Sequence, residues 1–455
     1  MDCWNLESFD VKAVWNDALR ILGEIGLRVP DDRVVKRVGG SLLAGDGCVR
    51  FPAELVEHYA AEIRERASAY APAEGRRKLS MYNSTIHSHY LDAATGETRP
   101  HTTQSLASHL KFIRSLAEDG VYSGHVPGYP LDVPPALQFL TAYYVECLYH
   151  KTPAAQCFAL SLEAARYNLE ITNLMGLTLS ISAEPLSPLK FAGESINIAL
   201  ELHGPGVSVH VDPMPIMGIT APMDWHAAWA QSVAENLGAY IIFRLCGVED
   251  VWPSLRLFVP NMATGMAYFT SPKHLLALLT RRKVHEFFGI HSDWAELLLV
   301  SSKAPDQQAA AEKAAGCVAG ALFGYTNLEG AGALCLDEVF SAEQLMLDIE
   351  ILDYVRAMIE EMPRADVDAV DEVRTGTAAG SFFGSDLTLS AFRDYIWRPR
   401  LFDLSTRAGW SGVPILEKAA KPSVEERAAA YTYELADARR EELERIMARA
   451  RRELA

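Results

Sequence analysis

The stretch from Ser301 to Asp348 constrains the fold more than any other part of the chain. It predicts, in order, a strand end, a turn, a helix of small residues, a short strand, a glycine loop and a second helix beginning at Ser341. That second helix carries Glu343 and Gln344 in its first turn, as helix starts commonly do. This order is one βαβα period, the unit of a parallel sheet covered by helices. The sequence therefore predicts an α/β fold.

The glycine loop of this period runs from Glu329 to Gly332 and reads EGAG. Parallel α/β folds place ligands at the carboxyl ends of strands, where helix amino termini and backbone amides converge. We therefore expect a ligand near this loop. A plain left-handed turn explains the glycines equally well, so they do not establish a site alone.

The length of 455 residues suits an α/β barrel, which takes about 250 residues, with additions at both ends. Hydrophobic residues make up 49% and charged residues 22%, so a large core is available and disorder is not expected. The net charge of -17 argues against a nucleic-acid surface, which requires basic patches. A cationic small molecule or a partner protein fits this sign, although a solvated acidic surface explains most of the charge.

The first ten residues, MDCWNLESFD, contain acids and no apolar run, and no stretch of the chain reads as a membrane span. Seven cysteines lie at positions 3, 48, 147, 157, 246, 317 and 335, without a CxxC pair or zinc-like spacing. They are typical of reduced, buried thiols. We expect a cytoplasmic protein that binds neither membranes nor nucleic acid.

Three units are predicted: an N-terminal cap or assembly module at 1–110, a barrel at 111–362 and a helical extension at 363–455. The extension ends in a charged helix from Ser423 to Leu454, which indicates an oligomer-packing or solvated surface. Helices are predicted between most strands, including Trp225 to Leu237 and Gln307 to Leu322. Eight candidate strands favour a (β/α)8 barrel over an open sheet: Tyr122–Val126, Ala154–Leu160, Leu177–Ser182, Val207–Val211, Tyr240–Leu245, Met266–Phe269, Glu296–Val300 and Gly324–Leu328.

Sites for a metal ion are poorly supported. His87 and His89 share a face of a predicted strand, but no third ligand is near them in sequence. His210 and Asp212 form a His-x-Asp pair on the fourth candidate strand, which suits a substrate, a divalent ion or a plain hydrogen bond. No HExxH, GxSxG, Walker or dinucleotide motif is present. We therefore predict no bound metal.

Aromatic side chains lie near the ends of several candidate strands. Aromatic faces attract quaternary ammonium groups, at about 0.5 to 2 kcal/mol per ring when water is excluded. Packing within a barrel explains any single ring as well. The rings expected to contact a substrate are those of Tyr129, Phe158, Tyr268, Trp294 and Tyr325.

Four segments together carry a resemblance to a known family. They are ILGEIGLRVPDDRVVKRVGG with CVRFPAELVEHY near the start, DPMPIMGITAPMDWHAAWAQSVAEN at 212–236, KAPDQQAAAEKAAGCVAGAL with EGAG at 303–332, and FRDYIWRPRLFD at 392–403. In their order and spacing they resemble the trimethylamine methyltransferase (MttB) superfamily, which includes non-pyrrolysine glycine betaine methyltransferases.

This resemblance implies a (β/α)8 barrel that demethylates a methylated amine and passes the methyl group to a cobalamin-type corrinoid held by a separate corrinoid protein. Cobalt(I) is a strong nucleophile and a quaternary ammonium releases a neutral amine, so the step requires positioning rather than acid–base groups. Methylamine enzymes of the family use pyrrolysine, which this chain lacks, so a quaternary amine such as glycine betaine is favoured. The resemblance also implies that Gly330 and Gly332 face the corrinoid. A homo-oligomer is expected.

The expected substrate-binding set also includes Glu184, His210, Arg244 and Glu329. Arg244, at the end of the fifth candidate strand, would hold the betaine carboxylate unless it forms an ion pair within the barrel. Family members often carry a histidine where this chain has Glu329, and another in the segment that reads GSFFGSDLTLSAF here at 380–392. Glu329 would complement a cation directly, so choline or a carnitine-like compound is an alternative substrate.

Two further functions remain open. One is a barrel that binds a quaternary amine as a sensor without transferring its methyl group, an idea that the change at Glu329 supports. The other is a divalent-metal lyase that uses His210, Asp212 and Glu184.

Overall fold

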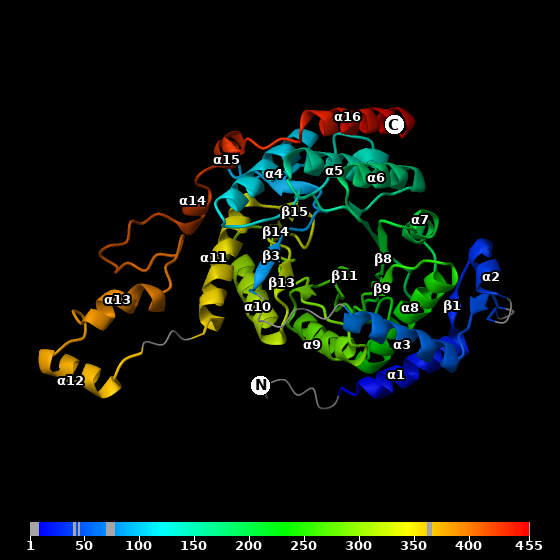
Figure 1. Cartoon of the computed structure of the whole chain (residues 1–455), viewed down its shortest axis with the longest axis horizontal. Helices are drawn as coiled ribbons and strands as arrows, with labels where there is room; N and C mark the ends of the chain where they lie inside the picture. The colour runs from blue at the N-terminus through cyan, green and yellow to red at the C-terminus, as the bar shows by residue number, and fades with distance from the viewer. Residues whose placement is uncertain (1–8, 40–41, 44–45, 70–77, 362–365, 455) are drawn as a thin grey trace.

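The computed structural model describes residues 9–39, 42–43, 46–69, 78–361 and 366–454. The chain is a mixed α/β protein, in which a body of helices surrounds short strands and a C-terminal arm extends away from that body (Figure 1). In the described ranges, no helix combines the length and the apolar character that crossing a bilayer requires.

The helices and strands follow each other along the chain in a mixed order. The helices of the body are α1 (Val11–Arg20), η1 (Ile21–Ile25), α2 (Asp32–Val38), α3 (Ala53–Ala69), α4 (Thr103–Glu118), η2 (Pro135–Leu137), α5 (Gln138–Tyr149), α6 (Leu162–Met175), α7 (Glu194–Leu202), α8 (Trp225–Leu245), α9 (Pro272–Phe287), α10 (Gln307–Phe323) and α11 (Ala342–Ile359). The C-terminal helices are α12 (Ala369–Ala379), α13 (Asp386–Tyr395), α14 (Ile415–Ala419), α15 (Val424–Ala430) and α16 (Asp437–Glu453). The strands are β1 (Leu27–Arg28), β2 (Cys48–Val49), β3 (Ser80–Tyr82), β4 (His89–Leu91), β5 (Thr98–Pro100), β6 (Gln156–Cys157), β7 (Leu179–Ala183), β8 (Val207–Val211), β9 (Val251–Pro253), β10 (Pro260–Asn261), β11 (Met266–Ala267), β12 (Trp294–Ala295), β13 (Asn327–Glu329), β14 (Ala333–Leu334) and β15 (Val339–Phe340).

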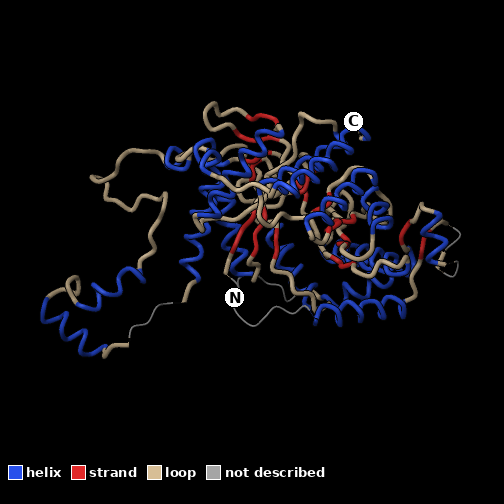
Figure 2. Tube along the Cα trace, turned by 45° about the horizontal axis from the view of Figure 1, so that its top comes forward, coloured by secondary structure: helices blue, strands red, loops and turns tan. Residues whose placement is uncertain are grey.

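Two all-parallel sheets lie on opposite sides of the centre of the body (Figure 1). One has the strand order β6-β7-β8-β9 and the other has the order β12-β13-β3. Helices lie outside both sheets, as they must when parallel strands are joined by crossovers (Figures 1 and 2). The predicted α/β class is therefore confirmed.

Alternation along the strands separates an outer apolar face from an inner polar face. In β8, Val207, Val209 and Val211 are buried in a hydrophobic core shared with α7 and α8, whereas Ser208 and His210 are more exposed. The strand period of two makes this separation, because successive side chains point to opposite faces. The inner face is therefore free to line a polar site.

The strand predicted at Tyr240–Leu245 is wrong, because these residues form the last turns of α8. This helix is enclosed on all sides, and its buried residues therefore include the continuous apolar run Tyr240, Ile241, Ile242 and Phe243. Such a run cannot be distinguished from a buried strand by periodicity alone. The strand that follows β8 in the sheet is β9 instead.

Strand β3 belongs to the same sheet as β13, with Leu328 opposite Met81. Residues assigned by sequence to the first unit thus pair with residues of the second, so the predicted boundary at 110 does not separate two sheets. Tyr122–Val126 is also not a strand. Nearby, Gly128 forms a single parallel bridge to His87.

The final helix is interrupted, since α15 ends at Ala430 and α16 begins at Asp437. The apolar stripe of α16, formed by Leu443, Ile446, Met447 and Ala450, is buried against residues of α5 and α6. This helix therefore packs within its own chain.

Candidate functional site

A cavity of about 520 Å3 opens beside the carboxyl ends of β6 and β7. Ser182 on β7 contributes to its wall, and Glu184 follows directly after that strand. The cavity has the size of a small-molecule site. Its wall is formed by Phe139, Cys157, Phe158, Ala159, Leu160, Ile181, Ser182, Glu184, Pro185, Leu186, Ser187, Gly193, Glu194, Ser195, Ile198, Met214 and Thr220.

Three aromatic rings pack against one another beside this cavity, and two of them, Phe139 and Phe158, line it. The Phe139 ring lies 4.6 Å from the Tyr129 ring and 5.7 Å from the Phe158 ring, centroid to centroid. Tyr129 and Phe158 were predicted from the sequence, but Phe139 was not. Phe139 lies near the start of α5, so a search for aromatic residues at strand ends does not find it. It comes close to Phe158 only in the folded chain.

The charged side chains of the cavity wall are acidic. Among the described residues that line it, Glu184 and Glu194 are the charged ones, and there is no lysine or arginine. Burial, and then the neighbouring Asp212 carboxylate, raise the pKa of Glu184. A carboxylate whose ionisation is disfavoured in this way gains from a cationic ligand.

A second acidic group, Glu329, lies at the end of β13 between two aromatic donors. The indole Nε1 of Trp294 donates to Glu329 Oε2 at 3.1 Å, and the Tyr82 hydroxyl donates to the same oxygen at 3.1 Å. Burial, and then the charge of Glu296, raise the pKa of Glu329 to about 7. Glu329 and Trp294 were predicted together, whereas Tyr82 was missed because its strand was assigned to the N-terminal unit.

A network of ion pairs reaches the cavity through Ser182. Arg256 pairs with Asp212 and with Glu296, the latter at 2.7 Å, and Arg281 pairs with Glu296 at 3.2 Å. Ser182, which lines the cavity, donates to Asp212 at 3.0 Å. Burial opposes ionisation of Glu296, but Arg281 and Arg256 outweigh it and lower the pKa of this carboxyl.

These two arginines therefore balance two carboxylates. Arg256 and Arg281 face Asp212 and Glu296, so neither guanidinium is left to neutralise Glu184 or Glu329 by direct contact. The centroid of the Trp294 ring lies 5.6 Å from the guanidinium carbon of Arg256 and 5.1 Å from that of Arg281. The inner face of the sheets thus carries a surplus of acidic groups beside aromatic rings.

The metal site proposed for His210, Asp212 and Glu184 is not formed. His210 lies on the inner face of β8, opposite Ser182 in the register of β7. Asp212, however, binds Arg256 and Ser182. In the described part of the chain, the proposed metal ligands do not bring their ligand atoms within 4.8 Å of one another. The guanidinium already neutralises the carboxylate that a divalent ion would need.

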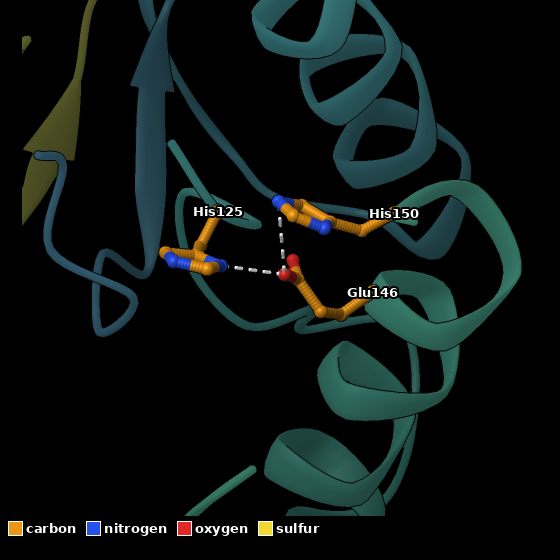
Figure 3. Close-up of side chains that lie close together, drawn as sticks. All are labelled: His125, Glu146 and His150. Carbon is orange, nitrogen blue, oxygen red and sulfur yellow. Dashed lines mark hydrogen bonds and ion pairs between the residues drawn. The ribbon is translucent and has the colours of Figure 1, made fainter. Parts of the chain in front are cut away.

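A different cluster, His125, Glu146 and His150, has ligand atoms within 4.8 Å of one another (Figure 3). His125 Nδ1 lies 2.7 Å from Glu146 Oε1, and the backbone N–H of Val126 donates to Glu146 Oε2 at 2.6 Å. Two histidines and a carboxylate are a ligand set that zinc accepts. Sequence analysis missed this cluster, although Glu146 and His150 are four residues apart at the end of α5.

The Arg114 guanidinium forms a hydrogen bond with one histidine of this cluster. Its Nη1 lies 2.9 Å from His150 Nε2, the atom that would face the ion. Burial lowers the pKa of His150 to about 4, and Arg114 acts in the same direction. The three residues therefore form a hydrogen-bonded cluster with the Arg114 guanidinium beside His150.

Of the predicted substrate-binding residues, Phe158 and Glu184 line the cavity, and three of the others are held by contacts elsewhere. Arg244, at the end of α8, pairs with Glu62 at 2.9 Å and donates to the carbonyls of Val248 and Glu249. Tyr325 is fully buried and donates to the Leu278 carbonyl at 2.8 Å. The hydroxyl of Tyr268 is 3.5 Å from Glu312.

A buried ion pair holds the glycine loop after β13 in place. Lys313 Nζ donates to Asp348 Oδ2 at 2.9 Å and to the Gly330 carbonyl at 2.7 Å. Asp348 also accepts the N–H of Gly332 at 2.7 Å. A Cβ at Gly330, where φ is +108°, would lie 2.5 Å from the Leu298 backbone. Gly330 and Gly332 are thus buried, and their close packing holds the end of β13 with Glu329.

Comparison with known proteins shows which family the chain matches. The family model described as trimethylamine methyltransferase (MTTB) matches residues 3–455. The chain is 27% identical over 232 residues to trimethylamine methyltransferase MttB of Methanosarcina thermophila, covering 50% of this chain and 47% of that protein. It is 26% identical over 230 residues to trimethylamine methyltransferase MttB2 of Methanosarcina mazei, covering 50% of this chain and 46% of that protein. The chain spans about half the length of the curated relatives it matches.

Among solved structures, the chain is similar to the crystal structure of the Methanosarcina barkeri monomethylamine methyltransferase (MtmB). The TM-score is 0.47 at 15% sequence identity, over 96% of this chain and 87% of that one. Because the family model covers almost the whole sequence, the chain belongs to the trimethylamine methyltransferase (MTTB) family.

Proposed function

We propose that this protein takes a methyl group from a quaternary ammonium compound and transfers it to a corrinoid carried by a separate protein. The observation that supports this most is the surplus of acidic groups on the inner face of the sheets. Glu184 and Glu329 have raised pKa values, and no lysine or arginine lines the described wall of the cavity. A permanent cation would neutralise carboxylates of this kind without their being protonated.

The fold proposed to carry this reaction is a (β/α)8 barrel. The two parallel sheets would be two arcs of one ring, with the bridge between His87 and Gly128 continuing it beyond β3. All strand pairs within each arc are parallel, and helices lie outside them (Figure 1). In such barrels the carboxyl ends of the strands form the active site.

We further propose that the substrate lacks a carboxylate. The arginine expected to hold the carboxylate of glycine betaine, Arg244, is paired with Glu62 at the end of α8. Arg256, which lies nearer the cavity, is occupied by Asp212 and Glu296. Choline or a similar cation therefore fits better than glycine betaine, whose carboxylate would meet Glu184 without a compensating charge.

The methyl acceptor would approach along an apolar surface next to the cavity. Exposed side chains there are Met214, which lines the cavity, and Met223 and Met262, whose sulfurs lie close together beside Gly218. Methionine surfaces adapt their shape to a bound partner. When bound, the reduced corrinoid supplies the nucleophile.

The residues of this chain would bind and orient the cation. Glu329, in its ionised form, would balance the ammonium charge, while the aromatic wall of Tyr129, Phe139 and Phe158 would pack against its methyl groups. Holding a methyl group in line with the acceptor contributes to the rate because it removes the entropy cost of alignment. The leaving group is a neutral amine, so no proton has to be donated.

A calorimetric titration tests the binding part of this proposal. Choline, tetramethylammonium, glycine betaine and trimethylamine are titrated into the purified protein at neutral pH. Tighter binding of the first two supports the proposal, while preference for glycine betaine contradicts the inferred lack of a carboxylate site. Binding without methyl transfer to added cob(I)alamin or the native corrinoid protein would instead favour the sensor function.

A further inference from the structure

A second and smaller space lies beside the cavity. It has a volume of about 30 Å3, and we call it the side pocket. Phe139 and Phe158 line both the side pocket and the cavity, so the two spaces adjoin at these rings. The side pocket differs from the cavity in the polar groups of its wall, which include Thr85, His125, Glu146 and Gln156.

The side pocket reaches the inner face of the sheets. Gln156 of β6 lies opposite Ser180 of β7, which in turn lies opposite Ser208 of β8. Gln156 is therefore on the inner face with these serines, whereas the next residue, Cys157, is buried. The Thr85 hydroxyl, which follows β3, donates to Gln156 Oε1 at 3.5 Å. The side pocket thus lies where the two parallel sheets approach each other.

His125 is held firmly at the wall of the side pocket. Its Nδ1 lies 2.7 Å from Glu146 Oε1, and the other oxygen of this carboxylate accepts the Val126 N–H at 2.6 Å. The His150 ring stacks on the His125 ring, with centroids 4.9 Å apart and planes inclined by 13°. The Asn83 side chain accepts the backbone N–H of His125 at 3.0 Å and donates to its carbonyl at 2.9 Å. Both the position and the orientation of the ring are therefore fixed.

The carboxylate of Glu146 decides which ring nitrogen of His125 carries the hydrogen. Burial opposes ionisation of Glu146, but the hydrogen bond from His125 outweighs it and lowers the pKa of this carboxyl. An ionised carboxylate only accepts hydrogen bonds, so His125 Nδ1 is the donor. In the neutral ring Nε2 then has a lone pair and no hydrogen, so it can only accept. Figure 3 shows this second nitrogen on the side of the ring away from Glu146.

His125 is the member of its cluster that a ligand can reach. Its side chain is 30% exposed, whereas those of Glu146 and His150 are 2% and 3% exposed. His150 does not line the side pocket among the described residues. His125 therefore offers the side pocket a hydrogen-bond acceptor in a fixed place.

We propose that the side pocket binds a hydroxyl group of the quaternary ammonium substrate, which donates its hydrogen to His125 Nε2. This inference rests on the proposed function and adds a residue that determines specificity. A water molecule needs about 10 to 15 Å3, so about 30 Å3 accommodates the last carbon and the oxygen of a hydroxyethyl group. The ammonium would stay at the rings of Phe139 and Phe158, which border both spaces. A carboxylate has no hydrogen to donate and would meet the charge of Glu146.

Calorimetric titration with two cations of similar size tests the side pocket. Choline carries the hydroxyl, and trimethylpropylammonium carries a methyl group in its place. We expect the wild type to bind choline about tenfold more tightly. His125→Phe, which keeps a ring at this position, should lose the preference, whereas His226→Phe should keep it, because His226 lines neither space. The preference is a ratio of two affinities in one protein, so a smaller folded fraction does not change it.

Glu146→Gln tests the direction of the hydrogen bond. The amide oxygen of the substituted side chain accepts the Val126 N–H, and its amide nitrogen donates to His125 Nδ1, which moves the ring hydrogen to Nε2. Because Nε2 then donates, glycine betaine should gain about tenfold in affinity relative to choline. A role of Glu146 in stability alone would leave this ratio unchanged.

Tetramethylammonium, which has no hydroxyl, separates the failure of this inference from the failure of the proposed function. Equal affinities for choline and trimethylpropylammonium, in a wild type that binds tetramethylammonium, would overturn the role of the side pocket and leave the proposed cation site intact. A preference that persists in His125→Phe, or a ratio that does not move in Glu146→Gln, would overturn it as well. If the wild type bound none of these cations, the proposed function would fail and this inference with it.

Discussion

The indole Nε1 of Trp294 donates a 3.1 Å hydrogen bond to the carboxylate of Glu329, which also accepts the Tyr82 hydroxyl. These residues come from β12, β13 and β3, three neighbouring strands of one parallel sheet. The carboxylate is thus oriented by two rigid aromatic donors, although burial and Glu296 oppose its ionisation. It is held in place but not neutralised, and this is the property expected of a group that binds a cation.

Glu329→Gln should weaken binding of tetramethylammonium or choline by about tenfold, which is ~1.4 kcal/mol. The amide oxygen of the substituted side chain can still accept from Trp294 or Tyr82, so the change removes the charge and little else. The fold should therefore be retained, with a melting temperature at or above that of the wild type. Calorimetric titration beside thermal melting measures both quantities, and unchanged affinity would remove Glu329 from the binding site.

Cation binding should become stronger as pH rises from about 6 to about 8, by roughly tenfold. The pKa of Glu329 is raised to about 7, so the carboxyl is mostly protonated at the lower pH and mostly ionised at the higher one. Glu329→Gln should flatten this dependence while leaving the remaining affinity in place. A pH profile that is the same in both proteins would show that another group controls binding.

The same raised pKa has a consequence for stability. The folded protein holds the Glu329 proton more tightly than the unfolded chain, whose carboxyl pKa is near the ordinary 4.5. The contribution of this residue to stability should therefore decrease as pH rises from that value to about 7, and stay constant above it. The free energy of unfolding is measured with denaturant at several pH values for the wild type and for Glu329→Gln. The difference between the two proteins isolates this effect.

Lys313→Met should destabilise the protein by about 3 to 5 kcal/mol, because it leaves the buried Asp348 carboxylate without its cation. Asp348 would keep the N–H of Gly332 but lose its only cationic partner in the described residues. The double variant Lys313→Met with Asp348→Leu should recover part of this loss, since no unpaired charge remains. Chemical denaturation measures the difference, and a loss below about 1 kcal/mol would contradict the structural role of the pair.

The His125–Glu146–His150 cluster should hold no stoichiometric zinc, because the Arg114 guanidinium lies 2.9 Å from His150 Nε2. Treatment with a chelator should leave the melting temperature unchanged, and added zinc should not raise it. Elemental analysis of the purified protein checks the same point. One equivalent of metal together with a lower melting temperature after chelation would show that Arg114 moves aside for an ion.

The sequence predicted the strands whose apolar and polar residues alternate, and failed where alternation was absent. Val207–Val211 was predicted with the bounds that β8 has, because three valines alternate with a serine and a histidine. Tyr240–Leu245 was mistaken for a strand, because α8 is enclosed on all sides and its apolar run has no period. The misplaced Arg244 followed directly from that error.

The site was predictable only where its residues lie at strand ends close in sequence. Glu184 and Phe158 could be placed beside the cavity from neighbouring strands. The contact of Tyr82 with Glu329 joins residues 247 positions apart, and no local pattern indicates such a pairing. The sequence also did not show that α12 and α13 extend away from the body (Figure 1). Amphipathic helices have the same pattern whether they pack within their own chain or not.

The most direct test of the proposed reaction follows a labelled methyl group. Choline with deuterated methyl groups is incubated with the protein and cob(I)alamin, and with the native corrinoid protein once it is available. The account predicts that one equivalent of dimethylethanolamine appears for each deuterated methyl group found in the corrinoid fraction, and that Glu329→Gln slows this transfer. Intact choline, in the presence of both the native corrinoid protein and confirmed binding, would contradict methyl transfer from this cation.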